Sequence, residues 1–103
     1  MVKQVLIYWR DIPAQVIVQR GRVREKAQCS QRFHEAIDRA AMRAGKGSSD
    51  AYMSEWRRVT SKIDTEAELR DIAEQEIDRF EAEFSDELLL QMIRNHGAMP
   101  EQS

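Results

Sequence analysis

His34 and Asp38 have the residue types and the spacing of half a metal site. They stand four residues apart, so a helix would place both side chains on the same face. A catalytic zinc site needs three protein ligands and a structural zinc site needs four. No ligand at helical or strand spacing completes this pair, and we therefore predict no metal site and no bound cofactor.

Cys29 is the single cysteine of the chain, and it would act as a nucleophile if a neighbouring cation lowered its pKa. It falls, however, on the same apolar stripe as Phe33 and Ile37, which favours a small buried hydrophobe. The carboxylates that crowd residues 64–87 are dense enough to form a solvated helix face. The sequence therefore predicts no catalytic residue, and a non-enzymatic role is the favoured interpretation.

Adjacent aromatic and arginine side chains form the best candidate for a binding site. Arginine and tryptophan are the residue types that anchor protein interfaces and bind planar anions. Here they lie at the end of one predicted strand, residues 2–9, and on a second, residues 51–60, which we expect to lie beside the first. Core aromatics flanked by arginines are the alternative interpretation. We call this set the predicted corner: Tyr8, Trp9, Arg10, Trp56, Arg57 and Arg58.

Basic residues also gather on the first predicted helix and before it. Together with aromatic residues on strands, such a cluster resembles the platforms that bind single-stranded nucleic acids. The pI is only about 5.7 and the chain contains no RNP-like run, so nucleic acid ranks last among the partners considered. The secondary basic edge comprises Arg22, Arg32, Arg39 and Arg43.

Three strands are predicted from β-branched or alternating segments. Residues 2–9 are rich in β-branched and aromatic residues and are apolar on both faces from Val5 onward, as in a central strand. Pro13 interrupts this pattern. Residues 14–20 then alternate as a half-exposed strand that forms a hairpin with the first. Residues 51–60 form the third strand.

Three helices are predicted from apolar residues at helical spacing. The first spans residues 24–44 and ends at the glycine-serine loop of residues 45–49. The second spans residues 65–84 and begins with a capping box. Ser85 has the type and position of a new N-cap, from which a short third helix continues to about residue 95.

The element order β-β-α-β-α-α predicts an α+β fold. Because a helix joins the second strand to the third, we expect these two strands to run parallel with the first strand between them. The predicted fold is a three-stranded mixed sheet in the order 2-1-3, with its helices packed on one face. Residues 1–97 are expected to form a single α+β domain, and residues 98–103 a flexible C-terminal tail.

Length and composition agree with one folded domain. The chain has 103 residues, of which 33% are charged and 42% are hydrophobic. Residues 1–45 hold nine basic and four acidic residues, whereas residues 46–103 hold seven and fourteen. Either the two halves attract each other within the fold, or the first half forms a basic face for an anionic partner.

The sequence contains no apolar run of the ~20 residues that a membrane-spanning helix needs. Its N-terminal apolar segment ends before Arg10, which is too early for a signal peptide. A single cysteine also differs from the disulfide-rich pattern of small secreted domains. We therefore expect a cytoplasmic protein with no membrane partner.

Three segments resemble a known family: IYWRDIPAQVIVQRGR, RFHEAIDRAAMRAG and DAYMSEWRR. They resemble the small bacterial virulence factor domain, which in Gram-positive bacteria also occurs within a larger protein called conserved virulence factor C. The resemblance covers roughly residues 3–92. The family name records a phenotype of the larger protein and implies no chemistry, so no site residue is carried over from it.

The leading hypothesis is a non-catalytic interaction or accessory domain of a bacterial cytoplasmic protein, whose protein partner binds the sheet face or the predicted corner. The resemblance suggests an alternative, an accessory or ligand-binding subunit of a one-carbon system with folate- or corrinoid-dependent methyl transfer. Such a subunit would hold a small anionic ligand in the same corner. A nucleic-acid-binding domain ranks third.

Overall fold

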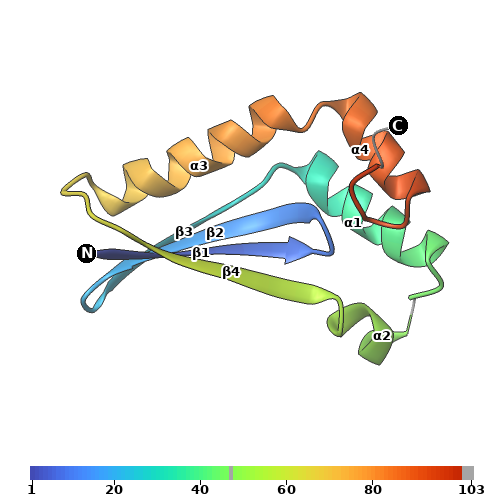
Figure 1. Ribbon diagram of the computed structural model, residues 1–103, viewed down its shortest axis with the longest axis horizontal. Coiled ribbons are helices and arrows are strands. Elements are labelled where there is room, and N and C mark those ends of the chain that lie inside the picture. Colours follow the sequence, from blue (N-terminus) through green and yellow to red (C-terminus); the bar gives the residue numbers. More distant parts are fainter. Residues whose placement is uncertain (47, 101–103) are drawn as a thin grey trace.

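The computed structural model describes residues 1–46 and 48–100 and shows an α+β fold (Figure 1). Gly47, in the predicted glycine-serine loop, and residues 101–103, in the predicted tail, lie outside the described residues. Along the described chain the elements are β1 (Val2–Trp9), β2 (Ile12–Arg20), β3 (Val23–Gln28), α1 (Gln31–Arg43), α2 (Ser49–Met53), β4 (Trp56–Ile63), α3 (Leu69–Glu83) and α4 (Asp86–Arg94).

β1 lies in the interior of the sheet, as its two apolar faces predict. The sheet has the order β3-β2-β1-β4. The three predicted strands correspond to β1, β2 and β4, and their predicted order 2-1-3 is confirmed as β2-β1-β4. β2 and β4 run parallel to each other on either side of β1. The predicted three-stranded mixed sheet is wrong, because β3 extends it and every neighbouring pair in the described chain is antiparallel.

The prediction that the first helix begins at residue 24 is wrong, because this segment forms strand β3. Gly21 has a φ of +59° and forms a two-residue turn with its successor, which sends the chain back along β2. Pairing with β2 outweighs the weak helical pattern of residues 24–28. Helix α1 begins only at Gln31.

The third predicted strand begins later than residue 51. Ser48 is the N-cap of the short helix α2, and its hydroxyl accepts a hydrogen bond from the backbone N–H of Ala51 at 3.4 Å. β4 starts at Trp56. A serine in the expected loop therefore starts a helical turn where a strand is predicted.

The capping box predicted before the second long helix does not form. Thr65 Oγ1 accepts a hydrogen bond from the N–H of Ala67 at 3.1 Å, and α3 begins at Leu69 after an extended Glu68. The Arg20 guanidinium donates to the carbonyl oxygens of Thr65 and Ala67, both at 2.9 Å, and so holds this segment outside the helix.

The N-cap predicted for the last helix is confirmed, since Ser85 Oγ accepts a hydrogen bond from the N–H of Leu88 at 3.1 Å. Phe33 and Phe80 both lie in the core, as the helical stripes predict. The ring of Phe84 bridges them, with its centroid 5.8 Å from that of Phe33 and 6.1 Å from that of Phe80. The core therefore joins α1 to α3.

The helices leave one face of the sheet largely uncovered. In Figure 1, α3 lies above the strands and α2 lies below their end, so α2 is the one helix of the described chain on that side. Val16 and Val18 of β2 belong to one core with the buried residues of α1, α3 and α4. Among the helices of the described residues, none has the length and hydrophobicity that a membrane span requires.

Candidate functional site

The register places the two halves of the predicted corner side by side. Trp9 lies opposite Trp56 in the β1–β4 pair, and Tyr8 lies opposite Arg57. Successive residues of a strand point to opposite faces of a sheet. Trp56 and Arg58 therefore face one side while Arg57 faces the other, and the corner is divided between two surfaces.

Trp9 belongs to the core and cannot contact a ligand at the surface. It is 0% exposed, its indole N–H donates to the carbonyl of Tyr52 at 2.9 Å, and its ring stacks on that of Tyr52 with centroids 6.0 Å apart. Gly97 packs against the same ring, since a Cβ there would lie 2.8 Å from Trp9 Cζ3. Trp9 is therefore a core residue and not the surface contact that the sequence predicts.

Arg10 holds the β1–β2 turn in place. Its φ of +53° lies in the left-handed region, which arginine rarely adopts. Its backbone N–H donates to the Glu55 carbonyl at 3.1 Å, and its guanidinium donates to Glu55 Oε1 at 3.3 Å and to the His96 carbonyl at 2.8 Å. The hydrogen bond from Arg10 lowers the pKa of the Glu55 carboxyl. These contacts occupy the guanidinium and offset the strain of the turn.

The guanidinium of Arg57 is also hydrogen-bonded within the chain. Its Nε donates to the Arg10 carbonyl at 2.6 Å and its Nη2 donates to Asp11 Oδ1 at 3.2 Å. The guanidinium also lies 4.5 Å from the ring centroid of Tyr8, which packs edge-on against Phe80 on the helix-covered side. Burial raises the pKa of the Tyr8 hydroxyl. Tyr8 and Arg57 therefore contribute to packing beneath α3.

The start of the predicted C-terminal tail is bonded to the same turn. Asp11 Oδ2 accepts a hydrogen bond from the backbone N–H of Met99 at 2.7 Å. The side-chain amide of Asn95 donates to the carbonyl oxygens of Ala98 and Met99. These contacts attach residues 98 and 99 to the end of the sheet.

Trp56 and Arg58 belong to a larger surface, the sheet face that α1, α3 and α4 do not cover, which we call the open face. Its members follow from the register, because residues directly opposite each other on neighbouring strands share a face. The open face comprises Lys3, Val5 and Ile7 of β1, Gln15, Ile17 and Gln19 of β2, Arg24, Lys26 and Gln28 of β3, and Trp56, Arg58, Thr60 and Lys62 of β4.

Five side chains of the open face are basic and none is acidic. None of the five forms an ion pair within the described part of the chain. Lys3 and Lys62 stand directly opposite each other, and like charges in this position cost stability. Arg24 of β3 lies in the same row across the sheet, because Gln19 of β2 is paired with Lys3 on one side and with Arg24 on the other. The open face therefore concentrates positive charge that an external anion would neutralise.

The centre of the open face is apolar and hollowed. Val5 and Ile7 are only 7% and 8% exposed, because long polar side chains on either side cover them. A hollow of about 120 Å³ lies over Val5, and one of about 290 Å³ lies over Ile7 between Trp56 and Met53. Arg58 lines both hollows, so they are neighbours along the face.

The secondary basic edge does not form one surface. Arg32 is occupied by the Glu81 carboxylate at 3.0 Å. Arg22 lies in the β2–β3 turn, which Figure 1 places at the opposite end of the molecule from α1. Arg39 and Arg43 remain together, in a groove of about 490 Å³ beside α4.

Cys29 and His34 have structural roles. Cys29 is buried, and burial raises the pKa of its thiol to about 12, which opposes nucleophilic chemistry near neutral pH. The Nε2 atom of His34 lies at hydrogen-bond distance, 3.1 Å, from the Cys29 carbonyl oxygen. No group of three or more potential metal ligands occurs among residues 1–46 and 48–100.

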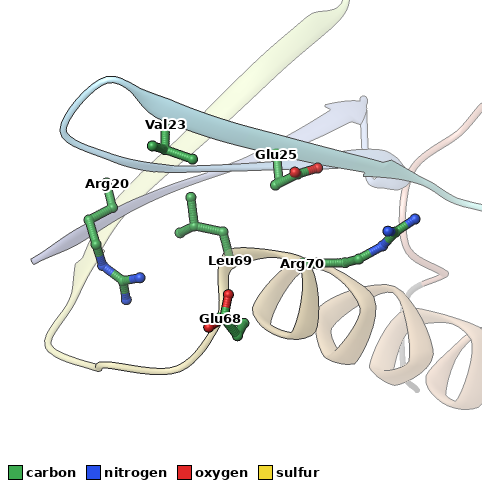
Figure 2. Close-up of a pocket in the computed structure, with 6 residues that line it drawn as sticks. All are labelled: Arg20, Val23, Glu25, Glu68, Leu69 and Arg70. Atoms are coloured by element: carbon green, nitrogen blue, oxygen red, sulfur yellow. The ribbon is translucent and has the colours of Figure 1, made fainter.

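A further hollow of about 190 Å³ lies between β3 and the start of α3 (Figure 2). Figure 2 shows Arg20 and Arg70 on opposite sides of it, with Glu25 and Glu68 between them. The Arg20 guanidinium is already bound to two backbone carbonyls. Because its lining carries both charges, this hollow favours no single class of ligand.

Comparison with known proteins assigns the chain to a family. The family model described as Virulence factor matches residues 7–93. The sequence matches no curated protein and no solved structure. Since the family description specifies no reaction, the function must be argued from the open face.

Proposed function

The chain belongs to the virulence factor family, and we propose that it is a non-catalytic binding domain that docks an acidic protein partner on its open face. The partner's carboxylates pair with the basic side chains of this face, and its apolar residues enter the two hollows that Val5, Ile7 and Ile17 line. Charge complementarity of this kind speeds association and sets the orientation of two proteins.

The observation that carries the proposal is that five basic residues without an ion-pair partner in the described chain gather on one surface, whereas the others that lack one are spread over β2, α1, α4 and a turn (Arg20, Arg22, Arg39, Arg43 and Arg94). Arg10, Arg20, Arg32, Arg57 and Arg79 each bind a carboxylate or a carbonyl oxygen of their own chain. The basic residues of the open face have no such partner among the described residues. Unneutralised charges that repel one another favour a role in recognition over a role in stability.

An acidic protein fits this face better than a single-stranded nucleic acid does. Nucleic-acid platforms offer several aromatic rings on which bases stack, whereas Trp56 is the one aromatic residue in the open-face set. The rest of the centre is aliphatic, like the apolar centre of a protein interface within a polar rim. A small anionic ligand in the predicted corner has less support, because Arg10 and Arg57 are occupied.

Probes of defined chemistry test the proposal. We expect the protein to bind poly-L-glutamate more tightly than single-stranded DNA of similar charge or anionic phospholipid vesicles. Arg58→Glu should weaken poly-L-glutamate binding by about tenfold or more, since it places a like charge in the interface. Arg70→Glu is the matched control, because Arg70 is an exposed residue of α3. Equal losses in the two variants, or tighter binding of DNA or vesicles, would contradict the proposal.

The natural partner can then be sought by affinity capture from the native host followed by mass spectrometry. A partner of the open face should be captured by the wild-type protein and by Arg70→Glu but lost with Arg58→Glu. It should also contain an acidic segment. Capture of a one-carbon enzyme that ignores the Arg58 substitution would favour the alternative subunit role.

A further inference from the structure

The larger hollow of the open face differs from the rest of that surface, because a helix closes one end of it. Strands β1, β2 and β4 contribute its floor and sides, and α2 contributes the methionine at its rim. The hollow has a volume of about 290 Å³. It is lined by Ile7, Gln15, Met53, Trp56, Arg57 and Arg58.

Trp56 forms a wall of this hollow that the core holds in place. Its ring packs edge-on against that of Tyr52, with centroids 5.8 Å apart and an angle of 84° between the planes. Tyr52 in turn stacks on Trp9, which is fully buried. Three aromatic rings in contact thus anchor the wall, so little ordering entropy is lost when a ligand packs against it.

The remaining lining suits an aromatic ring next to a carboxylate. Met53 is 63% exposed although it is apolar, and a thioether and an indole both pack favourably against aromatic rings. Arg58 has no ion-pair partner among the described residues. Its planar guanidinium can stack on a ring or bind a carboxylate through two hydrogen bonds.

The size of the hollow distinguishes a side chain from a cofactor. Pockets that enclose drug-sized ligands measure about 300–1,000 Å³. A hollow of about 290 Å³ that is open to solvent on the sheet face fits a single ring system. One side chain of a docked protein is an occupant of this size.

We infer that this hollow is the anchor site of the open face: it takes one aromatic side chain of the acidic partner, and Arg58 binds a carboxylate adjacent to that side chain. The inference rests on the proposed function and adds the recognition element, an aromatic residue flanked by Asp or Glu. A few buried aromatic anchors commonly supply most of the affinity of an interface.

Two blocked peptides test the anchor site, one with a phenylalanine between Asp and Glu residues and one with alanine in its place. The wild-type protein should bind the phenylalanine peptide about tenfold more tightly, as burial of one aromatic ring provides. Met53→Ala should reduce this ratio at least threefold because it removes the rim. Met42→Ala, at a methionine of α1 that is 73% exposed, should leave the ratio unchanged.

The outcomes separate the anchor site from the proposed function. If the wild-type protein binds both peptides equally, the anchor site is wrong and the acidic partner stands, because both peptides carry the same charge. If neither peptide binds and poly-L-glutamate does not bind, the proposed function is wrong as well. Equal effects of Met53→Ala and Met42→Ala on the ratio would also overturn the anchor site. Circular dichroism confirms that each variant is folded.

Discussion

The two faces of the sheet are built from alternate residues of the same strands, yet their chemistry differs. On the helix-covered face, Val16 and Val18 meet α1, α3 and α4 in one core, and the arginine at its border, Arg32, is neutralised by Glu81. On the open face, aliphatic side chains lie among basic residues that have no carboxylate beside them. The apolar and charged side chains of the first face are therefore paired within the chain, whereas the basic side chains of the second face have no acidic residue of the described chain beside them.

The contrast between the two faces is sharpest at Arg57 and Arg58. They are adjacent in sequence and identical in type, but Arg57 binds the carbonyl of Arg10 and the carboxylate of Asp11. Arg58 lines both hollows of the open face. Arg57 also lines the larger hollow, so the bonding of the guanidinium within the chain separates a stabilising role from a role in recognition.

The largest effect is expected from Phe80→Ala, which would leave a cavity beneath α3. Phe80 is buried and packs against Tyr8 and Phe84, so the free energy of unfolding should fall by about 3–5 kcal/mol. Trp56→Ala removes a larger side chain from the open face but should cost clearly less, because Trp56 is half-buried. Chemical denaturation measures both values. Equal losses would show that the open face belongs to the core.

A smaller loss is expected from Gly97→Ala, and Gly45→Ala provides its control. Both glycines have positive φ, +93° and +72°, so alanine strains each backbone by about 1–2 kcal/mol. A Cβ at Gly97 would also approach Trp9 Cζ3 to 2.8 Å, whereas one at Gly45 meets no atom of the described chain within 4 Å. Gly97→Ala should therefore cost about 1–3 kcal/mol more in a urea titration. Equal losses would show that Trp9 is not tightly held.

The two adjacent arginines should respond in opposite ways. Arg57→Ala should lower the free energy of unfolding by about 1 kcal/mol, since its hydrogen bonds are half-exposed. Arg58→Ala should change it by less than about 0.5 kcal/mol. Binding of poly-L-glutamate should weaken more with Arg58→Ala than with Arg57→Ala, because both residues line the larger hollow but the Arg57 guanidinium is already bonded to Arg10 and Asp11. The reverse result would assign recognition to the wrong face.

The smallest effect is expected from Lys62→Glu, and it is a gain in stability. A carboxylate opposite Lys3 replaces repulsion with attraction, which is worth about 0.2–1 kcal/mol. The gain should diminish at high salt because the pair is exposed. The same variant should bind poly-L-glutamate less tightly. A variant that is no more stable than wild type at low salt would show that the two lysines do not repel each other.

The elements with strong local patterns could be predicted from the sequence. Two apolar faces identified the interior strand β1, helical stripes placed Phe33 and Phe80 in the core, and Ser85 marked the start of α4. β3 has no comparable pattern, because five of its six residues are exposed and Ala27 alone packs against the core. An exposed edge strand of this kind is held by hydrogen bonds to its neighbour, which leave little periodicity.

The candidate site could be predicted only in part. Trp56 and Arg58 were identified by residue type, together with four residues that turn away from the open face or lie buried beside it. Lys3 and Lys62 have no feature of residue type that marks them as site residues, although the period of two in a strand places each on the same face as its neighbours two residues away. That period cannot say which face the helices cover.

The amino-acid pattern alone is enough to predict the interior strand β1, the helical stripes that bury Phe33 and Phe80, and the N-cap of α4. Local pairs such as Arg79 with Glu83 follow from helical spacing, but the neutralisation of Arg32 and Arg57 depends on the tertiary structure, because their partners are distant along the chain. Arg32 and Glu81 meet where α1 approaches α3, and Arg57 meets Asp11 through the pairing of β4 with β1. The antiparallel register places Lys3 opposite Lys62 with no acid between them, since register sets the partner of every residue in a sheet regardless of its charge.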